Sequence, residues 1–349
     1  MVLDRMADHG HETVTYASDP ETGLQAIVAI HDTTLGPALG GTRMLPYDTE
    51  REALRDVLRL SEAMTYKAAA ADLDLGGGKA VIVGDPELKS PELLAAYGRA
   101  VDGLGGRYVT SVDVNTGVPD MEIVAGETDH VVGLADGLGD PSPVTAYGVF
   151  RGLEATADYE LGEPVSELSV TVQGIGKVGT GLAERLLERG ADVTVSDVDA
   201  AAVAAFADEY GVDTVAPEDV YGEPCDVFAP CAIGGVVNDE TIPQLDCEIV
   251  AGGANNVLES PRHADELRER GIRYAPDYVI NAGGLITVYT EYVDGTLDEA
   301  FAEADLIGGR LVDLYERADD RGISTLAAAR AYAEERLDEE GSEPMAASV

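Results

Sequence analysis

Residues 169–179 read SVTVQGIGKVG, in which an apolar run leads directly into three closely spaced glycines. The run is typical of a buried strand, and Gly174, Gly176 and Gly179 have the G-x-G-x-x-G spacing that opens a helix in a dinucleotide-binding βαβ unit. The next strand-like run, ADVTVSD, ends at Asp197, 23 residues after Gly174. An acidic residue at about that distance is the second element of the motif. This stretch therefore predicts a parallel, doubly wound sheet.

Each glycine of the turn is expected to have its own structural role. The first makes the tight turn, the second lets the backbone approach a pyrophosphate, and the third brings helix and strand together. Lys177 and Val178 complete the turn, and the amino terminus of the following helix would face the phosphates. Asp197 is predicted to accept hydrogen bonds from the ribose diol and to repel a 2′-phosphate, which favours NAD over NADP. The alternative is an ordinary tight turn followed by a solvent-facing aspartate.

A nucleoside-triphosphate site is not predicted, although Lys79 and Lys177 each follow a glycine. The first glycine of a P-loop is replaced by Leu73 before one pair and by Thr171 before the other. Neither lysine is followed by Ser or Thr, which a P-loop needs to bind Mg²⁺.

The rest of the chain alternates strand-like and helix-like segments, which favours an α/β protein. Residues 49–67 are predicted to form an amphipathic helix with Thr49 as its N-cap, and AVIVGD, after the glycines at 76–78, a short buried strand. Glycine and proline cluster at 137–143, which indicates a linker. We therefore predict an amino-terminal domain at 1–138, a dinucleotide-binding domain at 139–308 and a helical segment at 309–349.

Further elements are predicted beyond the linker. A helix is expected at 144–161, and the apolar runs CDVFAP, EIVAGG and IRYAPDYVIN are expected to be parallel strands covered on both faces. Residues 297–337 are alanine-rich and predicted to be helical. The first domain is one surface on which this last segment could pack.

Acidic residues outnumber basic residues by 66 to 23, and the net charge of −43 is spread over the whole chain. Such a surface repels nucleic acid and anionic lipid headgroups, so neither is expected as a partner. Self-repulsion also destabilises the folded state in dilute buffer, and salt relieves it because the Debye length falls to about 3 Å at 1 M. We therefore hypothesise a halophilic source, an idea that full stability in dilute buffer would contradict.

The cysteines and histidines do not predict a disulfide or metal site. Cys225, Cys231 and Cys247 form no C-x-x-C pair, and reduced thiols fit the cytoplasm. Only His9 and His11 lie close together in the sequence, and two ligands leave a tetrahedral metal site half empty, so no metal is expected. No export signal and no run of eighteen apolar residues is found.

The chain has only four lysines, at positions 67, 79, 89 and 177. Lys67 stands between AMTY and AAAA, and Lys79 between GGG and AVIV, so both are predicted to be at least partly buried. Burial lowers the pKa of a lysine toward neutrality, where its amine can act as a base. The alternative is that each lysine reaches the surface or pairs with a carboxylate.

Eight segments resemble the glutamate, leucine, phenylalanine and valine dehydrogenase family, and within it the leucine dehydrogenases most. They are GPALGGTRM (36–44), AMTYKAAAADLDLGGGKAVI (63–82), TSVDVNTGVPDME (110–122), SPVTAYGV (142–149), VQGIGKVG (172–179), APCAIGGVVND (229–239), AGGANN (251–256) and YAPDYVINAGGLI (274–286). The resemblance implies an amino-terminal substrate-binding and oligomerisation domain, a Rossmann domain, a catalytic cleft between them and a homo-oligomer.

The resemblance also implies roles for single residues. Lys67 would hold the substrate carboxylate, helped by the backbone amides of Gly40 and Gly41. Lys79 would be the low-pKa base that activates water, and Asp113 would exchange protons with the amino group. Oxidative deamination needs such proton transfers near working pH, and the glycines before Lys79 would let backbone pass close to the substrate.

Two further groups of residues are implied by the resemblance. The nicotinamide side of the cofactor site would be lined by Thr145, Cys231, Ala232, Asn255 and Asn281. The substrate side chain would be lined by Leu39, Ser111, Leu285 and Val288. The second set contains no lysine or arginine, so glutamate is disfavoured because its second carboxylate would be buried unpaired.

The implied activity is reversible, NAD-dependent oxidative deamination of leucine, isoleucine or valine. Ser111 and Val112 depart from the usual leucine pattern, which has alanine and an acidic residue there, so phenylalanine or a broad preference stays open. A glutamate dehydrogenase and a non-catalytic NAD-binding relative are further alternatives. The second would not need Lys67, Lys79 and Asp113 together. A 2-hydroxy-acid dehydrogenase would need a histidine with an acidic partner and a substrate-binding arginine, and we find no such constellation.

Overall fold

Two units divide the chain in the computed structural model, which describes residues 1–342. Unit 1 comprises Met1–Gly139, Glu291–Asp294 and the chain from Ala333. Unit 2 comprises Asp140–Thr290 and Gly295–Tyr332. The division at Gly139 lies one residue after the boundary expected from the sequence. The carboxyl-terminal segment is shared, because its first part belongs to unit 2 and its last part to unit 1.

Unit 1 is built on a mixed five-stranded sheet in the order β1-β2-β4-β3-β5. Its β1, β2 and β4 pair antiparallel, whereas β3 pairs parallel with both β4 and β5. The elements are α1 (Val2–His9), β1 (Thr13–Asp19), β2 (Leu24–Asp32), β3 (Ala38–Leu45), α2 (Glu50–Ala70), β4 (Gly76–Val83), α3 (Pro91–Asp102), β5 (Tyr108–Val112) and α4 (Val118–Ala125).

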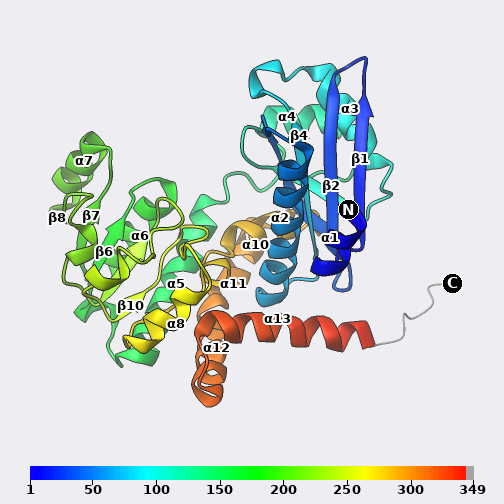
Figure 1. The fold of residues 1–349 in the computed structure, drawn as a ribbon. Helices are drawn as coiled ribbons and strands as arrows, with labels where there is room; N and C mark the ends of the chain where they lie inside the picture. Colours follow the sequence, from blue (N-terminus) through cyan, green and yellow to red (C-terminus); the bar gives the residue numbers. More distant parts are fainter. Residues whose placement is uncertain (343–349) are drawn as a thin grey trace. The chain divides into compact units, whose positions relative to one another are not determined.

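Helices cover both faces of this sheet (Figure 1). On one face, α2 buries Leu54, Val57 and Leu58 against Ile27 and Val81 of the sheet. The other face carries a larger apolar core to which α3 and α4 contribute. The Thr49 side chain accepts a hydrogen bond from the Glu52 amide at 3.2 Å, which confirms the predicted N-cap of α2.

The end of α13 (Thr325–Ser342) belongs to unit 1. Arg336 donates to the carbonyl oxygens of Ala69 (3.2 Å) and Leu73 (3.1 Å) and pairs with Asp74 at 2.9 Å. It therefore ties the end of α13 to the last turn of α2 and to the loop that follows it.

Unit 2 contains a six-stranded, fully parallel sheet in the order β11-β10-β9-β6-β7-β8. Its strands are β6 (Ser169–Gln173), β7 (Asp192–Ser196), β8 (Asp213–Thr214), β9 (Val227–Pro230), β10 (Ile249–Val250) and β11 (Arg273–Tyr274). Read from β8, this is the 3-2-1-4-5-6 order of the Rossmann fold. The order reverses between β6 and β9, and dinucleotides bind at the carboxyl ends of the strands at such a point.

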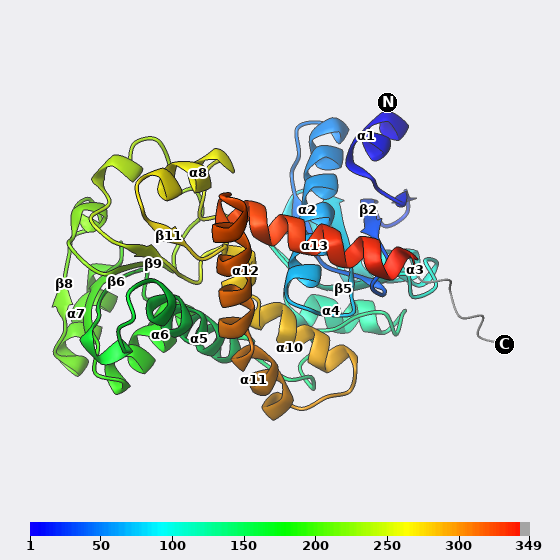
Figure 2. The same ribbon diagram turned by 90° about the horizontal axis from the view of Figure 1, so that it is seen from below.

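Helices cover both faces of the parallel sheet (Figure 2), with α5 and α6 on one side and α8 on the other. The helices of this unit are α5 (Ser142–Glu160), α6 (Lys177–Glu188), α7 (Ala200–Tyr210), α8 (Arg262–Glu269), α9 (Asp277–Ile280), α10 (Gly283–Tyr292), α11 (Leu297–Asp305), α12 (Ile307–Arg321) and the first turns of α13. No helix in the described part of the chain is both long and apolar enough to span a bilayer.

Three predicted boundaries were wrong. The glycines at 76–78 do not precede β4 but form its first residues. The run IRYAPDYVIN is a strand only at Arg273–Tyr274, because Pro276 cannot donate to a ladder and instead precedes the short helix α9. The helical region 297–337 is broken, and Gly322, with φ of 65°, ends α12 in the left-handed conformation that favours glycine.

Candidate active site

The most unusual polar pair of unit 1 joins Lys79 of β4 to Asp113, which directly follows β5. The Lys79 Nζ lies 2.8 Å from Asp113 Oδ2, and the lysine is only 7% exposed. Burial lowers the pKa of Lys79, and this effect outweighs the opposing attraction of the Asp113 carboxylate. A buried amine with a lowered pKa and a carboxylate in contact with it is an arrangement that can take up and return protons.

A third charged group, Arg43 of β3, also contacts Asp113. Its Nε donates to the same oxygen of Asp113, also at 2.8 Å. Burial alone would raise the pKa of Asp113, but the Lys79 and Arg43 cations lower it overall. Asp113 is therefore ionised at neutral pH.

The sequence-based interpretation missed Arg43, although one local signal pointed to it. Alternate residues of a strand share one face, so Arg43 lies on the same face as Gly41, which had been assigned to the site. The partner on its other side, Asp56 of α2, is contacted by Arg43 Nη1 at 3.0 Å. Asp56 belongs to no sequence motif, and only the packing of α2 on the sheet brings it next to Arg43.

Gly40 and Gly41 lie in β3, between β4, which carries Lys79, and β5, which Asp113 follows. A Cβ at Gly40 would stand 1.8 Å from the Gly78 carbonyl oxygen, and one at Gly41 would stand 2.3 Å from the Val112 carbonyl oxygen. Both glycines are therefore required for the close approach of neighbouring backbone. Their predicted role in holding a substrate carboxylate stays a prediction.

Lys67 lies half-buried near the carboxyl end of α2. Close by on the same helix, the Thr65 side chain would stand 2.1 Å from a Cβ at Gly77. A Cβ at Gly78 would meet the buried ring of Tyr108 at 2.6 Å. The glycines before Lys79 thus let α2 and the Tyr108 ring pack tightly against β4.

Two of the predicted pocket residues, Leu39 and Ser111, are buried in unit 1 at 3% and 5% exposure. Ser111 Oγ would lie 2.9 Å from a Cβ at Gly133, so the chain from 131 to 133 passes directly beside it. The other two, Leu285 and Val288, lie on α10 of unit 2, where Leu285 is 6% exposed and Val288 is half-buried.

The glycine turn of unit 2 has the geometry expected of a dinucleotide site. Gly174 has φ of 96° and a Cβ there would strike Ala232, while a Cβ at Gly179 would stand 1.9 Å from the Gly174 carbonyl oxygen. By contrast, a Cβ at Gly176 would meet nothing within 4 Å, so this glycine faces open space. Helix α6 starts with Gly176 as N-cap and no side-chain cap, which leaves first-turn amides available to an anion.

Asp197 is oriented toward this turn. Its Oδ2 accepts a hydrogen bond from the Ile175 amide at 2.9 Å, and its Oδ1 accepts one from the Asp199 amide at 2.9 Å. These bonds hold the carboxylate beside the turn, as ribose binding requires. Lys177 is exposed and pairs with Asp140 at 2.7 Å, and this contact lowers the pKa of Asp140 to about 2.

Of the residues predicted to line the nicotinamide side, Cys231 and Ala232 directly follow β9, Asn255 lies in the loop after β10, and Asn281 follows α9. The Asn281 amide donates to Asn255 Oδ1 at 3.0 Å, and the Gly253 amide donates to Cys231 Sγ at 3.4 Å. Burial raises the pKa of the Cys231 thiol to about 11, so this thiol is not a nucleophile at neutral pH. Val178 lies against Gly253, Ala232 against Gly174 and Thr145 against Gly283.

Another group of potential ligands in unit 2 is explained by ion pairs and hydrogen bonds. Asp239, His263 and Glu266 come close enough to share a metal ion. His263 Nδ1 accepts a hydrogen bond from the Ser260 amide, so its Nε2 carries the proton and donates to Asp239. Arg262 pairs with both carboxylates. The histidine therefore has no free lone pair for a metal.

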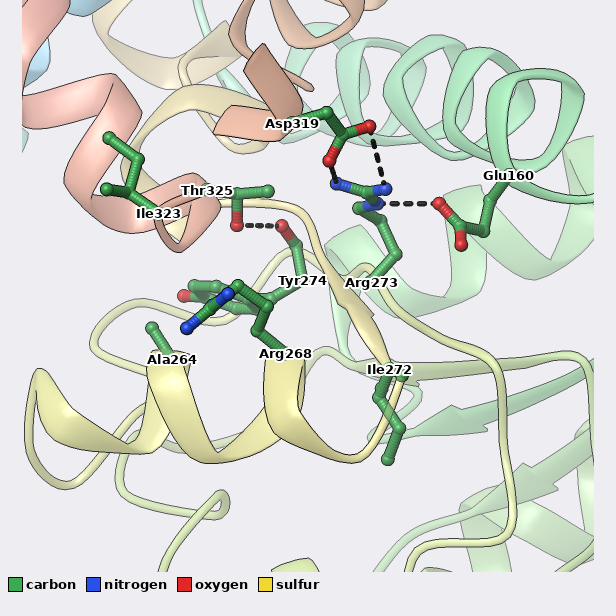
Figure 3. A pocket seen from close by; sticks show the side chains of 10 residues that line it. Glu160, Ala264, Arg268, Ile272, Arg273, Tyr274, Asp319, Ile323 and Thr325 are labelled. Atoms are coloured by element: carbon green, nitrogen blue, oxygen red, sulfur yellow. Dashed lines mark hydrogen bonds and ion pairs between the residues drawn. The ribbon is translucent and has the colours of Figure 1, made fainter. Parts of the chain in front are cut away.

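A cavity of about 90 Å³ in unit 2 (Figure 3) has no residue of the glycine turn in its lining. Its central cation, Arg273, is held by Glu160 at 2.6 Å and by both oxygens of Asp319 at 3.0 and 3.2 Å. With its charge balanced on two sides, Arg273 does not offer this cavity an unpaired positive charge for a ligand.

A Rossmann sheet with this glycine turn and Asp197, together with a separate unit that carries a buried lysine–aspartate pair, defines a dinucleotide-dependent dehydrogenase. Comparison with known proteins narrows this class. Residues 11–130 match the Glu/Leu/Phe/Val dehydrogenase dimerisation domain, and residues 198–318 match the Glutamate/Leucine/Phenylalanine/Valine dehydrogenase domain. The chain belongs to this family of amino-acid dehydrogenases.

Individual relatives match over nearly the whole chain. Leucine dehydrogenase of Geobacillus stearothermophilus is 48% identical over 95% of this chain and 92% of its own length. Phenylalanine dehydrogenase of Caldalkalibacillus thermarum is 47% identical over 97% of this chain and 93% of its own. The crystal structure of L-tryptophan dehydrogenase from Nostoc punctiforme superposes with a TM-score of 0.92 at 43% identity, covering 98% of this chain and 100% of that one.

Proposed function

We propose that this protein is an NAD-dependent dehydrogenase that oxidatively deaminates leucine, isoleucine or valine. The overall reaction converts the amino acid, NAD⁺ and water into the 2-oxo acid, ammonium, NADH and a proton. The observation that carries the proposal is the buried contact of Lys79 Nζ with Asp113 Oδ2 at 2.8 Å. The likeness to leucine dehydrogenase over 95% of the chain supports the choice of substrate.

Unit 2 fits the dinucleotide in three respects. The space at Gly176 admits a pyrophosphate, the uncapped amino terminus of α6 offers amides to it, and Asp197 is held beside the turn. An anionic carboxylate at that position would repel a 2′-phosphate, which is the reason for choosing NAD over NADP. The bound dinucleotide would supply the acceptor for the hydride that leaves the substrate Cα.

The protein's own groups would then move the protons. We assign Lys67 to the substrate carboxylate, where its ammonium would supply a charge-assisted hydrogen bond. Lys79 Nζ, whose pKa burial lowers, would in its deprotonated form take a proton from water as that water adds to the iminium carbon. Asp113 would pass protons to and from the substrate nitrogen, so that ammonia leaves as the carbonyl forms.

The central experiment follows NADH absorbance while purified protein is offered a panel of L-amino acids at high salt and alkaline pH. We expect the highest kcat/KM with leucine, isoleucine or valine. Lys79→Ala should lower kcat by about 10²- to 10⁴-fold, the usual contribution of a general base, while calorimetry shows unchanged NAD binding. A wild-type protein that reduces NAD with none of the amino acids would refute the proposal.

A preference for an aromatic amino acid is the second candidate. Ser111 and Val112 depart from the usual leucine pattern, and Val112 is 39% exposed beside Asp113. The same amino-acid panel decides between the two, because phenylalanine or tryptophan would then give the highest kcat/KM.

We further propose that the protein is a cytoplasmic homo-oligomer. The match of residues 11–130 to a dimerisation domain supports self-association, and three free cysteines suit a reducing compartment. Light scattering of the purified protein tests the first statement, because a monomeric mass would contradict it. Fluorescence microscopy of a tagged protein in its native cell tests the second.

A further inference from the structure

The two oxygens of the Asp113 carboxylate differ in their contacts. Lys79 Nζ and Arg43 Nε both contact Oδ2, each at 2.8 Å. Among residues 1–342, no hydrogen bond to Oδ1 accompanies them. One oxygen of this carboxylate is therefore held by two cations, and the other is left for a different partner.

Arg43 is held at both ends. Beyond Asp113, its Nη1 contacts Asp56 Oδ2 at 3.0 Å. Asp56 is itself fixed, because it accepts hydrogen bonds from the Tyr47 hydroxyl at 2.7 Å and from Arg59 at 3.0 Å. The planar guanidinium presents several donors in fixed directions, so it can bridge two carboxylates in a way that a lysine ammonium cannot.

This bridge is poorly explained as a device for stability alone. Partly buried ion pairs lose much of their Coulomb energy to desolvation, so they contribute little net stability. The side chain of Arg43 is only 16% exposed and that of Asp113 is 20% exposed. The geometry instead places a permanent cation, the Arg43 guanidinium, in contact with the same Asp113 oxygen as the amine of Lys79.

We propose that Arg43 is a positioning residue of the deamination reaction, which anchors Asp113 through Oδ2, leaves Oδ1 for proton exchange and weakens the carboxylate's hold on the Lys79 ammonium. This inference rests on the proposed function. Arg43 acts through Asp113 and Lys79 and does not itself move a proton, because a guanidinium keeps its charge at any working pH.

The electrostatic consequence follows from the contacts. Two cations on one oxygen lie within about 6 Å of each other, a range in which like charges disfavour each other's charged form. The charged groups around Lys79 are Asp113 from the end of β5, Arg43 from β3 and Asp56 from α2. Burial is the largest cause that lowers the pKa of Lys79; Arg43 lowers it further, whereas Asp113 and Asp56 raise it.

The test measures how readily Lys79 is acylated as pH rises, with an amine-reactive reagent and peptide mass spectrometry. Only four lysines are present, and exposed Lys177 serves as the reference in the same sample. In Arg43→Gln the midpoint for Lys79 should rise by about one pH unit because a neighbouring cation is lost. The acid limb of kcat/KM should move with it, and kcat should fall at least about tenfold because Asp113 loses its anchor.

Two further variants separate positioning from simple structural support. Asp56→Asn removes an anion, so it should move the Lys79 midpoint downward, opposite to Arg43→Gln, while also lowering kcat. Arg43→Lys keeps the positive charge and should hold the midpoint near the wild-type value, with reduced kcat because one ammonium cannot bridge both carboxylates. Arg99→Gln is the matched control, since Arg99 is an exposed arginine of unit 1 paired with Glu127 at 3.3 Å.

Opposite shifts in Arg43→Gln and Asp56→Asn support the proposal. Unchanged midpoints in both variants, with only a lower melting temperature, would overturn it. If Arg43→Gln does not fold, Asp56→Asn still decides, because a midpoint that stays or rises contradicts the inference. An inactive wild type would refute the proposed function instead, and labelling, which needs no substrate, would still show whether Arg43 acts on Lys79.

Discussion

Gly40→Ala tests whether the site depends on the close approach of β3 and β4. The added Cβ would stand 1.8 Å from the Gly78 carbonyl oxygen, far below the 3.0 Å under which real Cβ contacts essentially never occur. The backbone fixes the position of a Cβ, and the oxygen is itself a backbone atom, so no side-chain rotation can relieve the contact. The two strands must separate between the pairs Leu39–Gly77 and Thr42–Ala80, which flank the contact.

We expect Gly40→Ala to lower the free energy of unfolding by about 3 kcal/mol, the upper end for overpacking. For a unit of this size, that corresponds to a fall of roughly 10 °C in the first melting transition. The control is Gly309→Ala in α12, where a Cβ would meet nothing within 4 Å. This substitution should be neutral or stabilising by about 0.5–1 kcal/mol, because alanine is the better helix former.

Differential scanning calorimetry and KM for the amino acid together distinguish the two roles of Gly40. If Gly40→Ala melts like the wild type and only KM rises, the packing argument is wrong and Gly40 acts solely on the substrate. If both variants are destabilised equally, the effect comes from loss of glycine in general and not from the contact with Gly78.

Three other measurements follow from the structure. Asp197→Ala should lower kcat/KM for NAD by roughly 10- to 100-fold, the value of a charged hydrogen bond, and raise activity with NADP; unchanged cofactor preference would contradict the role of Asp197. Burial, assisted by His31, lowers the pKa of His11 to about 4, so as pH drops the unfolded chain binds this proton before the folded chain does. The free energy of unfolding should therefore fall between about pH 6.5 and pH 4, by up to about 1.4 kcal/mol per pH unit. His11→Gln should flatten the plot of melting temperature against pH, and an equally steep plot would show that other groups dominate. With a net charge of −43, the melting temperature should rise between about 0.1 and 2 M KCl as repulsion is screened, and a flat salt dependence would remove the halophilic hypothesis.

Local sequence patterns predicted several features of this protein. The strand, glycine turn and helix at 169–188, and Asp197 after the next strand, are short-range features whose backbone requirements are set by residues close in sequence. The N-cap at Thr49 is equally local. Lys79 stood out for the same reason, because its glycine and apolar neighbours are adjacent to it. These features were predictable without the tertiary structure.

The errors arose where nonlocal packing competes with local preference. The glycines at 76–78 have weak strand propensity, yet they form the start of β4 because only glycine fits between α2 and Tyr108. The helical region 297–337 has a continuous alanine-rich composition, but Gly322 ends α12 in a left-handed conformation. Propensity summed along the chain does not show where such a residue is needed.

The sequence by itself determined the class of cofactor site and singled out Lys67 and Lys79, since each depends on neighbours close in sequence, within one βαβ unit, one helix or one strand. Only the tertiary structure decided in which direction the pKa of Lys79 shifts. Its pKa depends first on burial, and then on Asp113 after β5, Arg43 of β3 and Asp56 of α2. Electrostatic interaction acts through space over a few ångströms, so strand register and helix packing set the reactivity that the motifs only suggested.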